Sequence, residues 1–155
     1  MENIKPARKH IRLKDKTAYY VHGQAVHLII HFVCADSETL TASQIIASKI
    51  TDISSEFNID VYAYSVMPNH IHLLILQTPE FGAIEFVKYL KGRCVSGFRQ
   101  ANLAVKFQKS FYDHILRSDE DVKQVAEYII ANPVRSGITQ KTGEHQFSGS
   151  LYYDL

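Results

Sequence analysis

The hydrophobic and polar positions of the chain fall into two kinds of segment. Short stretches rich in Val, Ile, Leu and aromatic residues have the length and composition of β-strands, at residues 25–33, 60–66, 70–76 and 111–117. Longer stretches repeat apolar residues at helical spacing, at residues 41–57, 81–101 and 122–132. The pattern therefore predicts the order strand, helix, strand, strand, helix, strand, helix.

Capping residues define the ends of two of the predicted helices. Thr41 and Gln44 have the spacing of a capping box at the start of the first helix. The polar run 118–121 supplies an N-cap for the last helix. Pro133 is expected to end that helix at Asn132, because the residue before a proline is pushed out of the helical region.

The order of the elements matches an α+β arrangement. The two middle strands are joined by a short turn at Pro68 and Asn69, so they should pair as an antiparallel hairpin. The first six elements suit a ferredoxin-like antiparallel sheet with helices on one face, and the last helix is an extra element. We expect the chain, 1–155, to form one domain with a basic N-terminal arm at 1–22 and a C-terminal tail at 138–155.

The composition is that of an ordinary globular protein, with 46% hydrophobic and 21% charged residues among 155. The sequence contains no apolar run near the roughly 18 residues of a membrane span and no charged-then-apolar leader. We therefore expect a cytoplasmic protein without a membrane partner. Cys34 and Cys94 lack CxxC spacing and are expected to be free thiols.

The basic residues are concentrated in two blocks, although the net charge is only +1. Twelve of the 17 Lys and Arg residues lie within 5–16 or 88–109, and residues 86–110 contain no Asp or Glu. Two local basic fields fit a polyanion that is bound at particular places. A solvated helix face and a loose tail explain the two blocks almost as well.

His70 and His72 flank one apolar residue within the predicted strand 70–76. The side-chain period of a strand is two residues, so both imidazoles point to one face with Cα atoms roughly 7 Å apart. From there both can reach one metal ion, or both can be hydrogen-bonded core residues. His27 and His31 share a face of the first strand, and we interpret them as structural or as supporting groups.

Tyr128 and Asn132 are spaced i, i+4 on the last predicted helix, so they share a face. An amide oxygen from Asn132 can complete a site begun by the two histidines. Two imidazoles and one oxygen suit Mn²⁺, or Mg²⁺ supported by substrate phosphates. A phenol one turn away can act as a nucleophile on a phosphate held by that metal, although a Tyr on an amphipathic helix is usually a packing residue.

Four blocks of the chain together resemble the single-tyrosine HUH transposases. They are Pro-Asn-His-Ile-His-Leu-Leu at 68–74, Tyr-Leu-Lys-Gly-Arg at 89–93, Phe-Tyr-Asp-His-Ile-Leu-Arg at 111–117 and Tyr-Ile-Ile-Ala-Asn-Pro-Val-Arg-Ser-Gly at 128–137. The most similar branch is that of the transposases associated with repetitive extragenic palindromes in bacteria. Four blocks in order and at compatible spacing are far more specific than any one of them.

The resemblance implies a role for each residue that matches. His70, His72 and Asn132 would bind a divalent metal, Mg²⁺ or Mn²⁺, and Tyr128 would attack single-stranded DNA near a hairpin. The attack would leave a 5′-phosphotyrosine link and a free 3′-OH, and its reversal would join strands. Tyr112, which the family does not use, is the alternative nucleophile. DNA contact is expected from the second helix and the N-terminal arm, through Lys88, Lys91, Arg93, Arg99 and Arg12.

The chain departs from the family in two places. Phe107-Gln108 stands where a Trp is common, and residues 146–148 stand where an aromatic-Pro-Trp-Ser segment is common. These departures leave open which hairpin is read and how the tail packs. Two other functions remain open, a non-catalytic hairpin-binding module with the same fold and a phosphodiesterase that uses activated water. The sequence does not decide which DNA sequence is the target, or whether the protein serves a mobile element or its host. It also leaves open a monomer or a homodimer, with the site formed in cis or in trans.

Overall fold

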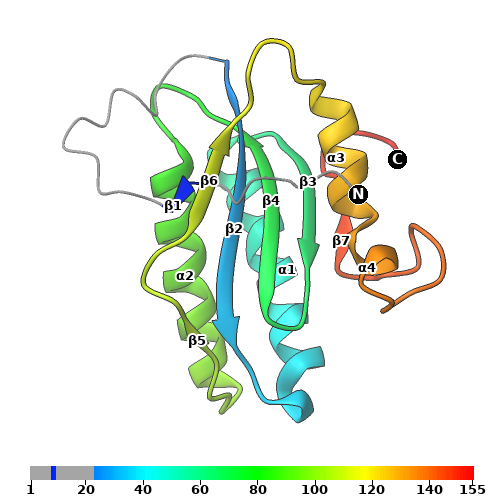
Figure 1. Cartoon of the computed structure of the whole chain (residues 1–155). Helices are drawn as coiled ribbons and strands as arrows, with labels where there is room; N and C mark the ends of the chain where they lie inside the picture. Colours follow the sequence, from blue (N-terminus) through cyan, green and yellow to red (C-terminus); the bar gives the residue numbers. More distant parts are fainter. Residues whose placement is uncertain (1–7, 10–22) are drawn as a thin grey trace.

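A computed structural model describes residues 8–9 and 23–155 of the chain (Figure 1). The predicted basic arm therefore lies outside the described residues, except for the two-residue strand β1 (Arg8–Lys9). Arg12 is one of the residues that are not described.

The strands form one antiparallel sheet in the order β1-β6-β2-β4-β3-β7. Its four longer strands are β2 (Ala25–Val33), β3 (Val61–Val66), β4 (His70–Leu76) and β6 (Tyr112–Ile115). A short strand, β5 (Lys106–Phe107), also pairs with β2. The central order β6-β2-β4-β3 is that of a ferredoxin-like sheet, and β3 and β4 form the predicted hairpin. The predicted fold class is thus confirmed.

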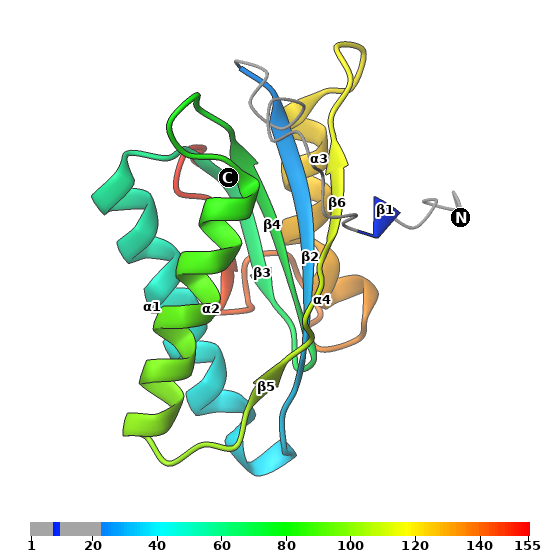
Figure 2. The same ribbon diagram turned by 90° about the vertical axis from the view of Figure 1, so that its left-hand side faces the viewer.

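The helices lie on both faces of the sheet (Figure 2). Helices α1 (Thr39–Phe57) and α2 (Ala83–Gln100) cover one face, and α3 (Val122–Ile130) with the short α4 (Asn132–Arg135) lies on the other. The larger apolar core fills the space under α1 and α2, and a smaller core joins α3 to β3 and β4. The extra helix of the prediction is therefore α3, it carries Tyr128, and it faces away from α1 and α2.

The observed helix ends correct two of the sequence predictions. Helix α1 begins at Thr39 after a 3-10 turn and has no side-chain cap, so the predicted capping box at Thr41 and Gln44 is wrong. Helix α3 begins after Asp121, whose Oδ1 accepts a hydrogen bond from the Gln124 N–H at 3.2 Å, as the polar run before it predicted.

The end of α3 also differs from the prediction. The helix ends at Ile130 and not at Asn132, and Pro133 lies in the first turn of a new helix, α4. Proline has no N–H to continue the α-helical ladder, but it is well suited to a first turn. The chain therefore restarts as a helix where we expected it to leave the helical region.

The last residues of the chain return to the sheet. Strand β7 (Ser148–Gly149) pairs with β3 at the sheet edge, and the Val66 N–H donates to the Phe147 carbonyl at 2.9 Å. Tyr152 and Tyr153 pack their rings against Tyr62. The predicted tail is therefore part of the folded domain. None of the described helices is long and apolar enough to span a bilayer.

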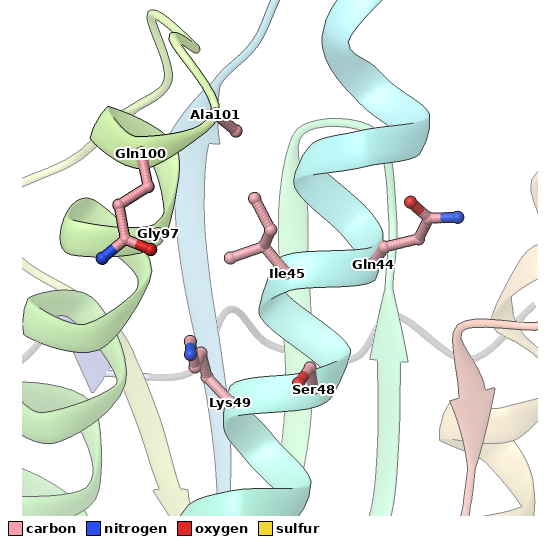
Figure 3. A pocket seen from close by; sticks show the side chains of 7 residues that line it. All are labelled: Gln44, Ile45, Ser48, Lys49, Gly97, Gln100 and Ala101. Atoms are coloured by element: carbon pink, nitrogen blue, oxygen red, sulfur yellow. The ribbon is translucent and has the colours of Figure 1, made fainter.

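Helices α1 and α2 are in close contact at Gly97. Figure 3 shows Ile45 of α1 pointing toward this glycine across a groove of about 410 Å³. A Cβ atom at Gly97 would lie 2.9 Å from Cγ2 of Ile45, whereas a Cβ at Gly92 of the same helix meets nothing within 4 Å. The glycine at position 97 thus sets the distance between the two helices.

These two glycines make a matched pair for a stability measurement. Gly97→Ala is expected to lower the free energy of unfolding by about 1 kcal/mol, because the stiff Ile45 side chain must move. Gly92→Ala is expected to raise it by about 0.5–1 kcal/mol through helix propensity. Urea unfolding of both variants tests this, and an equal gain from both would show that the helices are not in close contact at Gly97.

Candidate functional site

The face of the sheet on the side of α3 carries a cluster of histidines. His31 of β2 lies opposite His70 of β4, and Ile29 lies opposite His72. Residues directly opposite each other in an antiparallel pair share a face, and side chains along a strand alternate. His27, His31, His70 and His72 therefore all project toward one side, which is the side of α3.

His70 and His72 are close to each other and are each held by a neighbour. Their ring centroids are 4.9 Å apart with the rings nearly perpendicular. Nδ1 of His70 is 2.6 Å from Oδ1 of Asn69, and Nδ1 of His72 is 3.0 Å from Nε2 of His27. Because both Nδ1 atoms are engaged, the Nε2 atoms are the nitrogens left to bind a ligand. This is the usual arrangement of a metal-binding histidine and its supporting group.

Burial keeps His27, His70 and His72 uncharged at neutral pH. It lowers the pKa of His72 to about 3, with smaller contributions from His27, His70, Arg135 and His31. Burial, followed by the charge of His114, lowers the pKa of His27 to about 4. Burial and then His31 also lower the pKa of His70. Neutral imidazole is the form that binds metal ions.

The low pKa values predict that acid destabilises the fold. The unfolded chain takes up protons at His27 and His72 below about pH 6.5, whereas the folded chain does so only near pH 4 and pH 3. Above pH 6.5 these two residues do not lower the free energy of unfolding. As the pH falls from 6.5 toward 4, each of them lowers it by up to about 1.4 kcal/mol per pH unit. Urea unfolding at about pH 7 and about pH 5 measures this slope. His27→Gln should make it shallower, and an unchanged slope would contradict the assignment.

Tyr128 and Asn132 lie at the junction of α3 and α4 and are linked by Arg135. Tyr128 is 41% exposed, so its phenol is accessible to a large substrate. The guanidinium of Arg135 stacks on the Tyr128 ring, with Cζ 3.6 Å from the centroid, and donates to the main-chain oxygen of Tyr128 at 2.6 Å. It also donates to Oδ1 of Asn132 at 3.2 Å.

Two observations place this junction near the histidine cluster. The smaller core packs α3 onto Leu74 of β4, two residues beyond His72 on the same face. The positive charge of Arg135 contributes to the lowered pKa of His72, which places the guanidinium within electrostatic reach of that ring. Arg135 therefore contacts Tyr128 and Asn132 and lies near enough to His72 to act on its charge.

The donor set of this site fits a divalent metal with open positions. Among the described residues, no three or more His, Cys, Asp or Glu side chains are grouped so that they could hold a metal ion. The candidate metal-binding atoms are instead the Nε2 atoms of His70 and His72 and Oδ1 of Asn132, which accepts a hydrogen bond from Arg135. Two imidazoles and one amide oxygen leave positions for water or phosphate oxygens. A fully closed structural site has a different donor set.

Tyr112, the alternative nucleophile, lies on the same face of the sheet. It is opposite Ile29 in the register of β6 and β2, and its ring packs edge-on against His31 at a centroid distance of 5.9 Å. It is less exposed than Tyr128 and is only partly accessible. Tyr112 therefore borders the histidine cluster directly.

The basic residues of α2 that were predicted to contact DNA differ in their surroundings. Lys91 donates to the Gln108 carbonyl at 2.6 Å on the side of β5, and Arg93 forms an ion pair with Glu56 of α1 at 2.6 Å. Lys88 and Arg99 are exposed. All four belong to the helix on the other face of the sheet from the histidines (Figure 2). Arg12 lies outside the described residues.

Two features of the site were not predicted from the sequence. The contact of His27 with His72 depends on the register of β2 and β4, which no local pattern reveals. Arg135 is three residues after Asn132 and seven after Tyr128, a spacing that places all three on one helical face. The sequence therefore contains this signal, but only if the chain stays helical through Pro133.

Comparisons with known proteins agree on one kind of relative. A family model described as "Transposase IS200 like" matches residues 20–132. A protein of Haemophilus influenzae whose curated name places it among the REP-associated tyrosine transposases is 25% identical over 135 residues, which cover 70% of this chain and 74% of that protein. The ISDra2 transposase TnpA of Deinococcus radiodurans is 42% identical over 43 residues, 28% of this chain and 31% of that protein.

A solved structure shares the fold. It is the structure of a REP-associated tyrosine transposase bound to a REP hairpin, and it matches 90% of this chain and 82% of its own chain. The TM-score is 0.69 at 19% sequence identity. The antiparallel sheet with helices on both faces is therefore an architecture that has been observed before.

Proposed function

This chain belongs to the family of IS200-like transposases, and we propose that it cleaves and rejoins single-stranded DNA near hairpins with Tyr128 as the nucleophile. The observation that carries the proposal is the site around Arg135. Arg135 stacks on the exposed ring of Tyr128 and donates to the amide of Asn132, and its charge acts on the His72 imidazole. These are the groups that a phenol-dependent phosphoryl transfer requires.

In the proposed reaction Tyr128 forms a bond from its phenol oxygen to a phosphorus of the DNA backbone. The bond from phosphorus to the 3′ oxygen breaks, and the phenol proton passes to that oxygen. The products are a 5′-phosphotyrosine and a free 3′-OH, and the reverse reaction joins a 3′-OH to the held strand. Arg135 keeps the Tyr128 ring in place on one side while the other side of the exposed ring faces the substrate.

His70, His72 and Asn132 are the residues proposed to hold a divalent metal, Mg²⁺ or Mn²⁺. Such an ion polarises a phosphoryl oxygen and stabilises the negative charge that develops there. His27 and Asn69 orient the two imidazoles through their Nδ1 atoms. The fixed orientation means that no rearrangement of these rings is needed when a ligand arrives.

The proposed partner is single-stranded DNA with a hairpin. The relative of known structure holds a REP hairpin, so a hairpin is the first substrate to test. Lys88 and Arg99 are exposed on α2 and are proposed to contact the DNA backbone, together with Arg12. Lys91 and Arg93 already have partners, so we expect smaller contributions from them.

The whole chain is proposed to act as one domain with a site formed in cis. Helix α3 packs on the sheet of its own chain, which supports a site in which one chain supplies both Tyr128 and the histidines.

The test is the formation of a covalent protein–DNA adduct. The protein is mixed with labelled hairpin oligonucleotides that carry single-stranded flanks, with Mn²⁺ or Mg²⁺, and the products are separated on a denaturing gel. An adduct that a chelator prevents would support the proposal. Binding of a hairpin without an adduct would favour a non-catalytic hairpin-binding module, and cut strands without an adduct would favour a nuclease that uses water.

A further inference from the structure

Arg135 contacts both of the residues that the proposed reaction takes from α3 and α4. Its guanidinium lies on the Tyr128 ring at 3.6 Å and donates to the Tyr128 carbonyl and to Oδ1 of Asn132. These two hydrogen bonds use two of its five N–H groups. The side chain is exposed, so its remaining donors can meet a ligand that arrives from solvent.

The hydrogen bond to Asn132 engages the oxygen that the proposed metal site needs. The guanidinium is positively charged throughout the neutral pH range, and it lies 3.2 Å from Oδ1 of Asn132. A positive charge at that position disfavours a divalent cation bound to the same oxygen. In the DNA-free protein Arg135 therefore opposes metal binding in two ways, by its charge and by its hydrogen bond to Oδ1 of Asn132.

We propose that Arg135 binds the DNA phosphate that Tyr128 attacks, and that in the free protein it is held instead on Asn132 and on the Tyr128 ring. This inference rests on the proposed function. The planar guanidinium can donate two parallel hydrogen bonds to phosphate oxygens. When it moves from Asn132 to a phosphate, the amide oxygen is released and the positive charge is neutralised. DNA and metal then each strengthen the binding of the other.

The first measurement is the affinity for Mn²⁺ without DNA, by electron paramagnetic resonance, for the wild type and Arg135→Gln. The variant is expected to bind Mn²⁺ about 5-fold to 10-fold more tightly, because the repulsive charge is gone. Arg135→Lys keeps the charge without the planar fork and should stay closer to the wild type. Lys49→Gln removes an equal charge from α1, on the other face of the sheet, and should leave the affinity unchanged.

The second measurement repeats the titration with a bound hairpin oligonucleotide in a Tyr128→Phe background. The phenylalanine ring retains the stack with Arg135, and no strand is cut. The hairpin is expected to raise the Mn²⁺ affinity by about 10-fold when Arg135 is present. It should have little effect once Arg135 is replaced by Gln.

The sign of the first result decides the inference. Weaker or unchanged Mn²⁺ binding in Arg135→Gln would overturn it, because Arg135 would then only support Asn132 or have no part in the site. Absence of Mn²⁺ binding in every variant would also overturn it. The proposed function has a separate test. If the wild type forms no adduct while the Mn²⁺ titrations still show the effect of Arg135, the proposed function is wrong and the inference about Arg135 stands.

Discussion

Replacing Tyr128 with phenylalanine is expected to abolish the covalent adduct with hairpin DNA, a loss of about 10⁴-fold or more in its rate of formation. The variant lacks only the phenol oxygen, which is the atom proposed to form the bond to phosphorus. The ring is 41% exposed, and its stack with Arg135 involves the ring face. The fold and most of the affinity for DNA should therefore remain.

Tyr112→Phe is the matched control for this experiment. Its ring is on the same face of the sheet and touches His31, so it reports on a phenol that borders the site without the contact to Arg135. We expect an adduct at near wild-type rate from this variant. If Tyr112→Phe loses the adduct and Tyr128→Phe keeps it, the nucleophile has been assigned to the wrong side of the site.

The affinity of Tyr128→Phe for the hairpin separates catalysis from binding. A gel shift without metal should give a dissociation constant within a few-fold of the wild type. If the wild type itself forms no adduct and the two proteins bind equally, the chain is a hairpin-binding module that has no use for the phenol. If the variant binds far more weakly, Tyr128 is a DNA contact and not a nucleophile.

The order of the elements and the sheet could be predicted from the sequence because both depend on local signals. Alternation of apolar residues defines the strands, and the short turn at Pro68 and Asn69 leaves only an antiparallel hairpin. The placement of His70 and His72 on one face follows from the strand period alone. The helix that carries Tyr128 was predicted with an N-cap within 118–121, because capping is also local, and the structure identifies the cap as Asp121.

The sequence could not predict the partners of charged and polar side chains. A helical wheel places Lys91 and Arg93 on the surface of α2, but their partners, Gln108 and Glu56, come from other elements. The hydrogen bond of His27 to His72 likewise needs the register of two strands that are far apart in the sequence. Such contacts depend on tertiary packing, which decides whether a cation can reach DNA.

The end of α3 shows a different limit. Pro133 was interpreted as a stop, since proline removes a donor from the helical ladder. Proline is equally favourable in the first turn of a helix. The helical conformation of Ala131 shows that Pro133 begins a new helix here and does not end the helical region. The consequence for the site is large, because the restarted helix brings Arg135 back onto Asn132 and Tyr128.

The second large effect is expected from the paired histidines. His70→Ala and His72→Ala should each weaken Mn²⁺ binding by more than about 100-fold and reduce adduct formation by about 10³-fold or more. Each substitution removes one of the two imidazole nitrogens that the site offers. His145, which bonds to Ser148 near the sheet edge, is a control, and His145→Ala should change neither quantity. Isothermal titration with Mn²⁺ and the adduct assay measure the two effects.

His27 provides a graded test of the same site, because it holds His72 without being a ligand in the proposal. Loss of the 3.0 Å contact lets the His72 ring turn, so His27→Ala should weaken Mn²⁺ binding by about 10-fold to 100-fold. His27→Gln can still accept a hydrogen bond from Nδ1 of His72 and should recover part of that loss. If His27→Ala costs as much as His72→Ala, then His27 itself binds the metal. If His27→Ala leaves the Mn²⁺ affinity unchanged, the contact does not orient His72, and the orientation of His72 must come from the sheet.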